Sequence, residues 1–189
     1  IDEQEYNFRV SFMPTYHGEN AVIRLLPAHA VQGMSFAKLG FTPDHVLLIA
    51  NALQRPNGLL VLAGPPGSGK TTTLRTCLAL KAEEPLSILT LEDPIEYEIP
   101  GIRQIHIRHA HGMTFAEGLR AALRQDPDVI MVGEIRDAET ARVVVHTALT
   151  GHLVFSTVHT NSALEVIPRL ADMGIDHYLL ASTLRLIVA

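Results

Sequence analysis

The feature that most constrains how this chain can fold is the run GPPGSGKT at residues 64–71. The run satisfies the pattern G-x-x-x-x-G-K-[ST] in full, follows an apolar strand-like stretch and opens a helix-like one, which is the context the pattern needs. Its glycines let backbone N–H groups surround phosphate oxygens, and the start of the helix adds partial positive charge. An ordinary glycine turn is the alternative, but motif and context together favour a nucleotide-binding loop. The residues expected to bind nucleotide are Gly64, Pro65, Pro66, Gly67, Ser68, Gly69, Lys70, Thr71 and Thr72.

Two side chains of this loop carry chemistry beyond that of its backbone. Lys70 can reach the β- and γ-phosphates of a nucleotide, and the hydroxyl of Thr71 can ligate Mg²⁺. The expected ligands of the chain are therefore ATP and Mg²⁺.

From residue 58 onward, strand-like and helix-like runs alternate along the chain. The strand-like runs are rich in Val, Ile and Leu and span residues 59–64, 87–92, 128–133 and 152–158, with a further candidate at 102–107. The helix-like runs span residues 71–82, 114–125, 137–149 and 163–174. Apolar strands that alternate with helices predict an α/β fold, whose mainly parallel sheet is covered on both faces.

Local signals mark where several helices begin. Thr114, with Glu117 three residues later, predicts a capping box, and Asp137 predicts the N-cap of the next helix. Pro168 is expected to kink or restart the helix in which it lies. A further helix-like run, residues 44–54, precedes the first strand and ends at a turn sequence.

Residues 1–30 differ from the rest of the chain. Two β-like runs, YNFRVSFMP and NAVIRLLP, end at prolines and are separated by HGEN, which supplies turn residues. We expect the edge of a small antiparallel domain here, then a linker over residues 31–43 and a second domain over residues 44–189. The last run, LRLIVA, stops in mid-pattern, so we expect the chain to be a piece of a longer protein.

The composition narrows the class of protein. Hydrophobic residues make up 47% of the chain and charged residues 19%, which suits a substantial folded core. The formal net charge is −5. Nucleic acid is therefore not expected as a partner, because proteins bind it through basic surfaces. Cys77 is the single cysteine, so an intramolecular disulfide is excluded. No apolar run approaches the length of a bilayer-spanning helix.

Two acidic clusters follow apolar strand-like runs, and we expect both at the same rim as the phosphate loop, because ligands of open α/β sheets lie beyond the carboxyl ends of the strands. Glu134 is placed to hold or polarise Mg²⁺, and Glu96 could reach an attacking water. Solvated turn acids are the alternative, and Glu98 is assigned to the surface. The clusters consist of Glu92, Asp93, Glu96 and Glu98, and of Glu134 and Asp137.

Histidines flank the apolar run at residues 153–158. His159 lies at its carboxyl end, where it could sense the γ-phosphate. His152 lies at the other end, roughly 20 Å away at about 3.3 Å per residue. It could cap the start of the strand or face a neighbouring subunit. A third group, for which a metal site is a minor alternative because no cysteine or acid stands at ligand spacing, consists of His106, His109 and His111.

Arginines are further candidates, because phosphoryl transfer gains from cations near the developing charge. Arg9 and Arg24 lie on the β-like runs of the first segment and could close over the γ-phosphate, although ordinary surface arginines look the same. Arg120 and Arg124 share a helix face, and either a salt bridge at a subunit seam or plain solvation would account for them.

Four segments occur in one order with close spacing: GPPGSGKTTT, TLEDPIEYE, LRQDPDVIMVGEIRD and TGHLVFSTVHTNSA. Together they resemble the Walker A, Asp box, Walker B and His box of the secretion ATPase superfamily. Among its members, the type II secretion and type IV pilus assembly ATPases are the most similar. FRVSFMPTYHGENAVIRLL resembles the end of that family's PAS-like second N-terminal domain, so the resemblance covers nearly the whole chain.

The resemblance implies a RecA-like P-loop core that works as a hexameric, ATP-driven motor. It also implies a cytoplasmic location, peripheral on the inner membrane, and a membrane platform protein as partner. By the same resemblance Glu96 polarises the lytic water and Glu134 serves Mg²⁺. The positions that match the family's His-box histidines and phosphate-reaching arginines are His152, His159, Arg9 and Arg24.

The chain departs from the family pattern in places. Ser162 stands where the His box usually has an acid, and IHIRHAHGMTF is unusually rich in histidine. GEIRD and LRQDPD favour an assembly or secretion motor, with a pilus retraction motor as the alternative. A RecA-like nucleic-acid translocase is less favoured, because it needs a basic channel or stacking aromatics and aromatic residues make up 5% of the chain. A nucleotide-gated module without turnover ranks lower, because both acids are present.

Overall fold

Six strands form one parallel sheet in the computed structural model, which describes residues 6–27, 34–108 and 112–189. Its strands are β3 (Gly58–Ala63), β4 (Ile88–Glu92), β5 (Arg103–His106), β6 (Val129–Val132), β7 (Leu153–Val158) and β8 (Leu184–Val188). Their order across the sheet is β5-β4-β6-β7-β3-β8, and every neighbouring pair is parallel.

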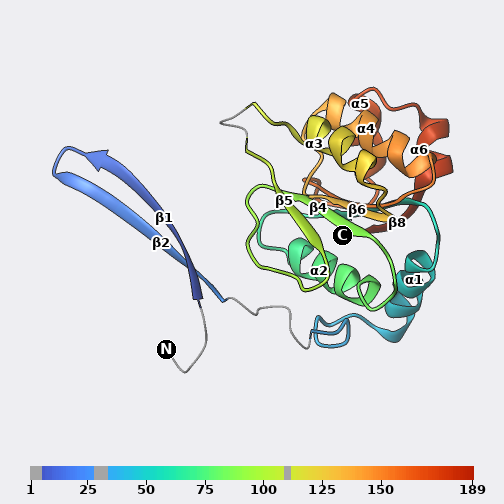
Figure 1. Cartoon of the computed structure of the whole chain (residues 1–189), viewed down its shortest axis with the longest axis horizontal. Coiled ribbons are helices and arrows are strands. Elements are labelled where there is room, and N and C mark those ends of the chain that lie inside the picture. Colours follow the sequence, from blue (N-terminus) through green and yellow to red (C-terminus); the bar gives the residue numbers. More distant parts are fainter. Residues whose placement is uncertain (1–5, 28–33, 109–111) are drawn as a thin grey trace.

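Helices cover both faces of this sheet. They are α1 (Pro43–Leu53), α2 (Lys70–Lys81), α3 (Phe115–Ala122), α4 (Ala138–Leu149), α5 (Val166–Asp172) and α6 (His177–Thr183). Figure 1 shows α1 and α2 on one side of the sheet and α3 to α6 on the other. The predicted α/β fold with a doubly covered, mainly parallel sheet is therefore confirmed. None of the helices in the described ranges has the length and apolar character that spanning a bilayer requires.

The sheet divides the hydrophobic core in two, because successive side chains of a strand point to opposite faces. In β3, Leu59 and Val61 pack with residues of α3 to α6, whereas Leu60 and Leu62 pack with residues of α1 and α2. All four side chains are buried. Burial on both faces explains why this strand is continuously apolar rather than alternating.

The predicted helix starts at Thr114 and Asp137 are confirmed. The Thr114 hydroxyl accepts a hydrogen bond from the backbone N–H of Glu117, and the Glu117 carboxylate accepts one from the backbone N–H of Thr114. These hydrogen bonds hold the pKa of Glu117 below its usual value. Asp137 caps α4 by accepting from a backbone N–H in the first turn at 2.8 Å. The prediction for Pro168 was wrong. The helix α5 begins two residues earlier, so Pro168 lies in the first turn, where its missing N–H costs no hydrogen bond.

Two parts of the chain add to the core in ways that the sequence pattern did not predict. The run LRLIVA contributes β8, which pairs with β3 at the edge of the sheet, and α6 leads into it. Phe36, within the segment predicted as a linker, is 6% exposed and belongs to the same buried cluster as Ile49 and Leu60.

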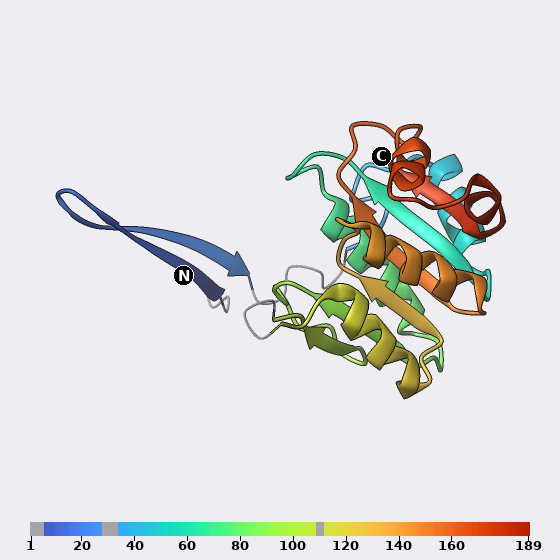
Figure 2. The ribbon, with the colours of Figure 1, turned by 90° about the horizontal axis from the view of Figure 1, so that it is seen from above.

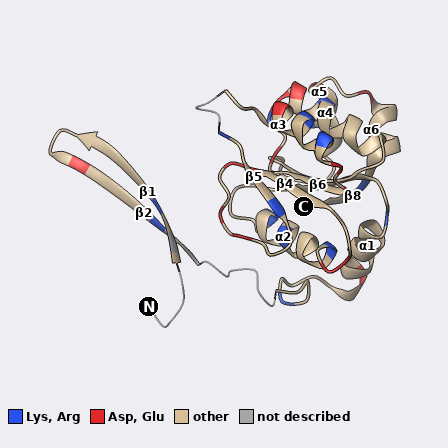
Figure 3. Cartoon of the chain, in the orientation of Figure 1, with Lys and Arg blue, Asp and Glu red and all other residues tan. Residues whose placement is uncertain are grey.

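Residues 6–27 form a separate antiparallel ribbon of β1 (Tyr6–Thr15) and β2 (Gly18–Pro27), as both views show (Figures 1 and 2). Its register places Arg9 directly opposite Arg24, so both lie on one face. The ribbon carries few charged positions (Figure 3). The exposed large side chains of its other face are Phe8, Val10, Phe12, Ile23 and Leu25. Membership of a PAS-like domain stays a prediction.

The single cysteine provides a test of the packing of α2. Cys77 is 4% exposed, and burial raises the pKa of its thiol to about 12. Because the thiolate is the reactive form, we expect the folded 189-residue chain not to react with Ellman's reagent at about pH 8. Unfolding in guanidinium should release one equivalent of the chromophore, measured by absorbance. Rapid stoichiometric reaction of the folded chain would contradict the buried position of Cys77.

Candidate functional site

The carboxyl ends of β3, β4, β6 and β7 border one pocket with a volume of about 230 Å³. This is the edge where ligands of open α/β sheets bind. The lining includes seven residues to which the sequence analysis assigned functions: Pro66, Gly67, Lys70, Thr71, Glu96, Glu134 and His159. The structure thus brings these residues together, and their chemical roles stay predictions.

The phosphate loop turns sharply between β3 and α2. Gly67 and Gly69 have φ angles of 80° and 91°, in the left-handed region that favours glycine. Gly69 is the N-cap of α2, so the N–H groups of the first turn have no partner within the helix. The ammonium group of Lys70 donates to the carbonyl oxygens of Gly64 at 2.7 Å and Pro65 at 2.9 Å. The loop therefore holds its lysine at the place where it would meet phosphate.

Hydrogen bonds that extend the sheet beyond the ends of its strands fix the backbone around Glu134. Gly133 N–H donates to the carbonyl of Leu91 at 2.8 Å, and Ile135 N–H donates to the carbonyl of Thr157 at 2.9 Å. The hydroxyl of Thr157 donates to the carbonyl of Gly133 at 2.8 Å. A Cβ at residue 133 would lie 3.2 Å from the Leu91 carbonyl oxygen, so glycine allows this close approach.

The side chain of Glu134 is 12% exposed and lies beside an arginine and a histidine. Its Oε2 lies 2.6 Å from Nε of Arg136 and 3.3 Å from Nε2 of His159. Neither contact has the alignment of a hydrogen bond, so this buried oxygen has no hydrogen-bond partner among the described residues. Partial burial lowers the pKa of Lys70, whereas the Glu134 carboxylate acts in the opposite direction. A buried acceptor of this kind suits a divalent cation or its bound water.

A second carboxylate, Glu92, is anchored at the end of β4. It is 4% exposed, and its Oε1 accepts hydrogen bonds from the Thr90 hydroxyl at 2.7 Å and from the Gln104 amide at 2.8 Å. Because these donors belong to β4 and β5, two paired strands determine the position of the carboxylate.

Arg75 lies against these carboxylates, and the sequence analysis did not single it out. It is 2% exposed on α2, and its Nη2 lies 3.5 Å from Oε2 of Glu92 and 3.5 Å from Oε2 of Glu96. Its guanidinium carbon lies 4.5 Å from the ring centroid of Tyr97. The available signal was its spacing, three residues before the apolar Leu78, which places a charge on the buried face of the helix.

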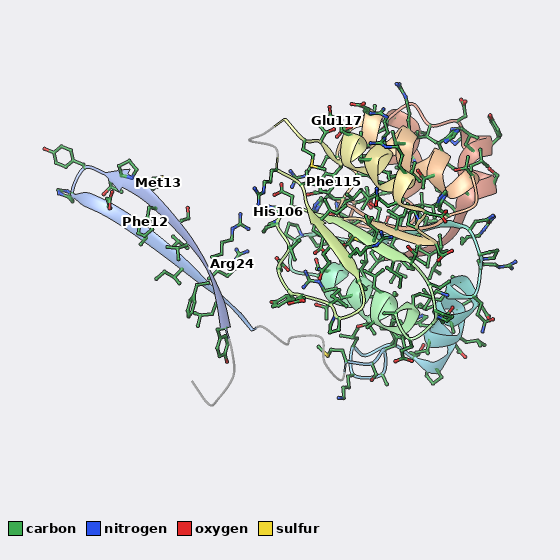
Figure 4. The ribbon with its side chains drawn as sticks, in the orientation of Figure 1. Phe12, Met13, Arg24, His106, Phe115 and Glu117 are labelled. Atoms are coloured by element: carbon green, nitrogen blue, oxygen red, sulfur yellow. The ribbon has the colours of Figure 1, made fainter. Side chains whose placement is uncertain are left out.

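The two arginines of the β1–β2 ribbon, Arg9 and Arg24, do not line this pocket. Arg9 and Arg24 are exposed, and Figure 4 shows Arg24 on the two-stranded ribbon. Arg120 donates to the carboxylate of Glu139 at 2.8 Å, an exposed ion pair between α3 and α4 within one chain. Figure 3 shows acidic and basic positions interspersed on these two helices.

Among the described residues, the histidines other than His159 do not line the pocket. His152 precedes β7, and its Nδ1 lies 3.3 Å from the carbonyl oxygen of Thr147 near the end of α4. This contact is with the preceding helix, so the predicted cap at the start of the strand stays a prediction. His106 is exposed on β5. Outside the described residues lie the other two members of the predicted histidine group, His109 and His111.

Comparison with known sequences places the whole chain in one family. The profile described as type II/IV secretion system protein matches residues 1–189. The chain is 50% identical over 189 residues to type II secretion system protein E of Xanthomonas campestris pv. campestris, covering 100% of this chain and 33% of that protein. It is 49% identical over 189 residues to a putative type II secretion system protein E of Escherichia coli, covering 100% of this chain and 38% of that protein. The chain therefore spans about a third of the length of the curated relatives it matches.

Solved structures share the fold. The pilus retraction motor PilT with bound ADP aligns with a TM-score of 0.79 at 36% identity, covering 94% of this chain and 52% of that one. The ATPase DotB of Legionella pneumophila aligns with a TM-score of 0.72 at 28% identity, covering 95% of this chain and 50% of that one. The VirB11 ATPase of Brucella suis aligns at 0.60 with 22% identity, covering 96% of this chain and 66% of that one, a likeness of fold alone.

These findings confirm the resemblance that the four sequence boxes indicated. The boxes with Lys70, Glu96, Glu134 and His159 surround one pocket, and the fold around them is that of solved secretion ATPases. The chain belongs to the type II/IV secretion system protein family.

Proposed function

We propose that this chain is the core of a Mg²⁺-dependent ATPase that works as a hexameric motor. The observation that carries the proposal is the pocket in which Lys70, Glu96 and Glu134 meet beyond the strand ends. A cation for phosphates beside two carboxylates supplies the groups that phosphoryl transfer to water needs. The PilT structure, which has the same fold and contains ADP, supports this class of nucleotide.

Each side chain has a distinct task in this proposal. The loop amides and Lys70 bind the phosphates of ATP. Glu96 accepts a proton from a water molecule, whose oxygen attacks the γ-phosphorus while the bond to the ADP oxygen breaks. The side chain of His159 is 48% exposed beside Glu134, where it can respond to the presence of the γ-phosphate.

The residues present also fit Mg²⁺, which neutralises phosphate charge when it is bound. Thr71 and Glu134 would hold the ion. Thr71 offers an exposed hydroxyl in the first turn of α2. Glu134 offers the buried Oε2, which has no hydrogen-bond partner in the described part of the chain and lies 2.6 Å from Nε of Arg136. Oxygen ligands of this kind are those that Mg²⁺ prefers.

The cellular machine is proposed from the relatives. The chain is 50% and 49% identical to two proteins named for type II secretion and 36% identical to the retraction motor PilT. This difference favours protein secretion, with type IV pilus assembly next and retraction as the alternative. A hexamer on the cytoplasmic face of the inner membrane, turning over against a platform protein, follows from the same likeness.

Glu96→Gln tests the assignment of the base. In the intact protein this change should preserve ATP binding and lower turnover by about a hundredfold or more, because an amide cannot accept the proton of water. Phosphate release measures turnover, and a fluorescent ATP analogue measures binding.

Glu98→Gln is the matched control for this substitution. Glu98 lies two residues away on the same segment, is exposed and does not line the pocket. It should hydrolyse ATP like the unaltered protein. Equal phosphate release by the two variants would remove Glu96 from the role of base.

Lys70→Ala tests the phosphate loop. It should raise the Kd for ATP about ten- to hundredfold, since a hydrogen bond from a charged group contributes about 1.5–3 kcal/mol. Lys38→Ala, at an exposed position outside the pocket, should bind like the unaltered protein in the same titration. Unchanged affinity in Lys70→Ala would show that phosphate binds elsewhere.

The hairpin arginines test whether the first segment completes the site. By family likeness we propose that Arg9 and Arg24 reach the phosphates in the assembled motor, through movement of the hairpin or from a neighbouring subunit. Arg9→Ala and Arg24→Ala should then each lower kcat of the assembled protein about tenfold or more. Arg55→Ala, at an exposed position, controls for loss of surface charge. Unchanged kcat in both hairpin variants would exclude the proposed contact.

A further inference from the structure

Arg75 carries a buried charge to which the proposed reaction gives no task. Burying a guanidinium is costly unless anions compensate it. Arg75 meets this need with Glu92 and Glu96, each 3.5 Å from its Nη2. The guanidinium carbon lies 4.5 Å from the ring centroid of Tyr97, and Nε is buried with no hydrogen-bond partner among the residues that the structure describes. One nitrogen therefore serves both carboxylates.

The two carboxylates differ in how firmly they are held. Glu92 has a side chain that is 5% exposed, and Thr90 and Gln104 both donate to it. Glu96 has a side chain that is 33% exposed and lies in the irregular segment after β4. Its ion-pair partner among the described residues is Arg75. Arg75 thus links Glu92, which is fixed by hydrogen bonds, to Glu96, whose segment is irregular and more exposed.

We propose that Arg75 is a positioning residue for Glu96, anchored on Glu92, and that it holds the Glu96 carboxylate at the wall of the phosphate pocket. The inference rests on the proposed function, because that function makes Glu96 the base. Without the cation, the Glu96 carboxylate would lose its ion-pair partner among the described residues, and hydration would favour its displacement toward solvent. Repulsion from an ionised Glu92 would add to this effect, which does not depend on it. Misplacing a reacting group by about 1 Å can cost about a hundredfold in rate.

The position of Arg75 also couples the base to the phosphate loop. Lys70 and Arg75 lie five residues apart on α2, and the helix begins directly after the loop. The lysine that would bind phosphate and the arginine that holds the base therefore belong to one rigid element. Binding of phosphate at one end of this element and orientation of Glu96 beside it would change together.

The test is a double-mutant cycle on kcat in the intact protein, in a Glu92→Gln background. Removing Arg75 alone would leave Glu92 as an unpaired buried charge, which commonly costs about 3–5 kcal/mol of stability. The background avoids this, because glutamine can still accept from Thr90 and Gln104. Four proteins are compared: the background, and the background with Arg75→Gln, with Glu96→Gln, or with both.

We expect Arg75→Gln to lower kcat about tenfold or more when Glu96 is present and less than about twofold when residue 96 is glutamine. KM and the Kd of a fluorescent ATP analogue should change little, because the ion pair acts on the base and not on phosphate binding. A merely structural role for Arg75 would lower kcat by the same factor in both halves of the cycle, and that result would overturn the inference.

The outcomes also separate this inference from the proposed function. Unchanged kcat in the Glu96→Gln variant of the background would remove Glu96 as base, and the inference would fall with it. Loss of turnover in that variant, with equal effects of Arg75→Gln in both halves, would overturn the inference alone. If the background itself does not turn over, Arg75→Lys and Arg75→Gln are compared in the otherwise unaltered protein. Higher kcat at equal KM in Arg75→Lys supports positioning by charge, and equal kcat in the two contradicts it.

Discussion

Backbone pairing that continues past the ends of the parallel strands is the interaction on which the candidate site depends. The N–H groups of Gly133, Ile135 and Ile107 donate to the carbonyls of Leu91, Thr157 and Glu92, so the segments that follow β5 and β6 stay paired with the neighbouring strands β4 and β7. As independent loops, these segments would each lose conformational entropy on ordering their side chains. Because they are paired, formation of the sheet itself places Glu92, at the end of β4, and Glu134, just after β6, at one edge.

Much of the fold could be predicted, because strands buried on both faces are continuously apolar and helix caps have a local chemistry. Thr114 and Asp137 are examples in which the decisive hydrogen bonds lie within one turn. The failures are non-local. Pairing with β3 makes LRLIV a strand, and packing against α1 and the sheet buries Phe36. Neither contact leaves a periodic pattern in the segment itself, and elements as short as α6 and β8 carry little periodicity.

The candidate site was predictable to the extent that motifs follow strand ends. Lys70, Glu96, Glu134 and His159 meet because each lies beyond the carboxyl end of a parallel strand, as the topology requires. Arg75 escaped notice because its partners come from a different strand end and because it lies outside the motif GPPGSGKT with which its helix begins. Arg9 and Arg24 illustrate the opposite case, in which the resemblance to a family assigns a role that the residues' own surroundings do not indicate. Family likeness assigned them to the phosphates, while their local sequence fixes only that they face each other across the ribbon.

Because Arg9 and Arg24 are paired across the ribbon, the turn at the tip of the ribbon determines how these two residues lie relative to each other. The turn at Tyr16 and His17 sets the register, with Gly18 at a φ of 126° and the Thr15 hydroxyl donating to its carbonyl at 2.8 Å. Successive side chains of a strand point to opposite faces. A slip of one residue in either strand would therefore move the arginine of that strand, Arg9 or Arg24, to the opposite face of the ribbon. An insertion of a single residue within β2 would separate the paired cations as thoroughly as replacing one of them. The position of the two guanidinium groups relative to each other thus depends on a turn that contains neither of them.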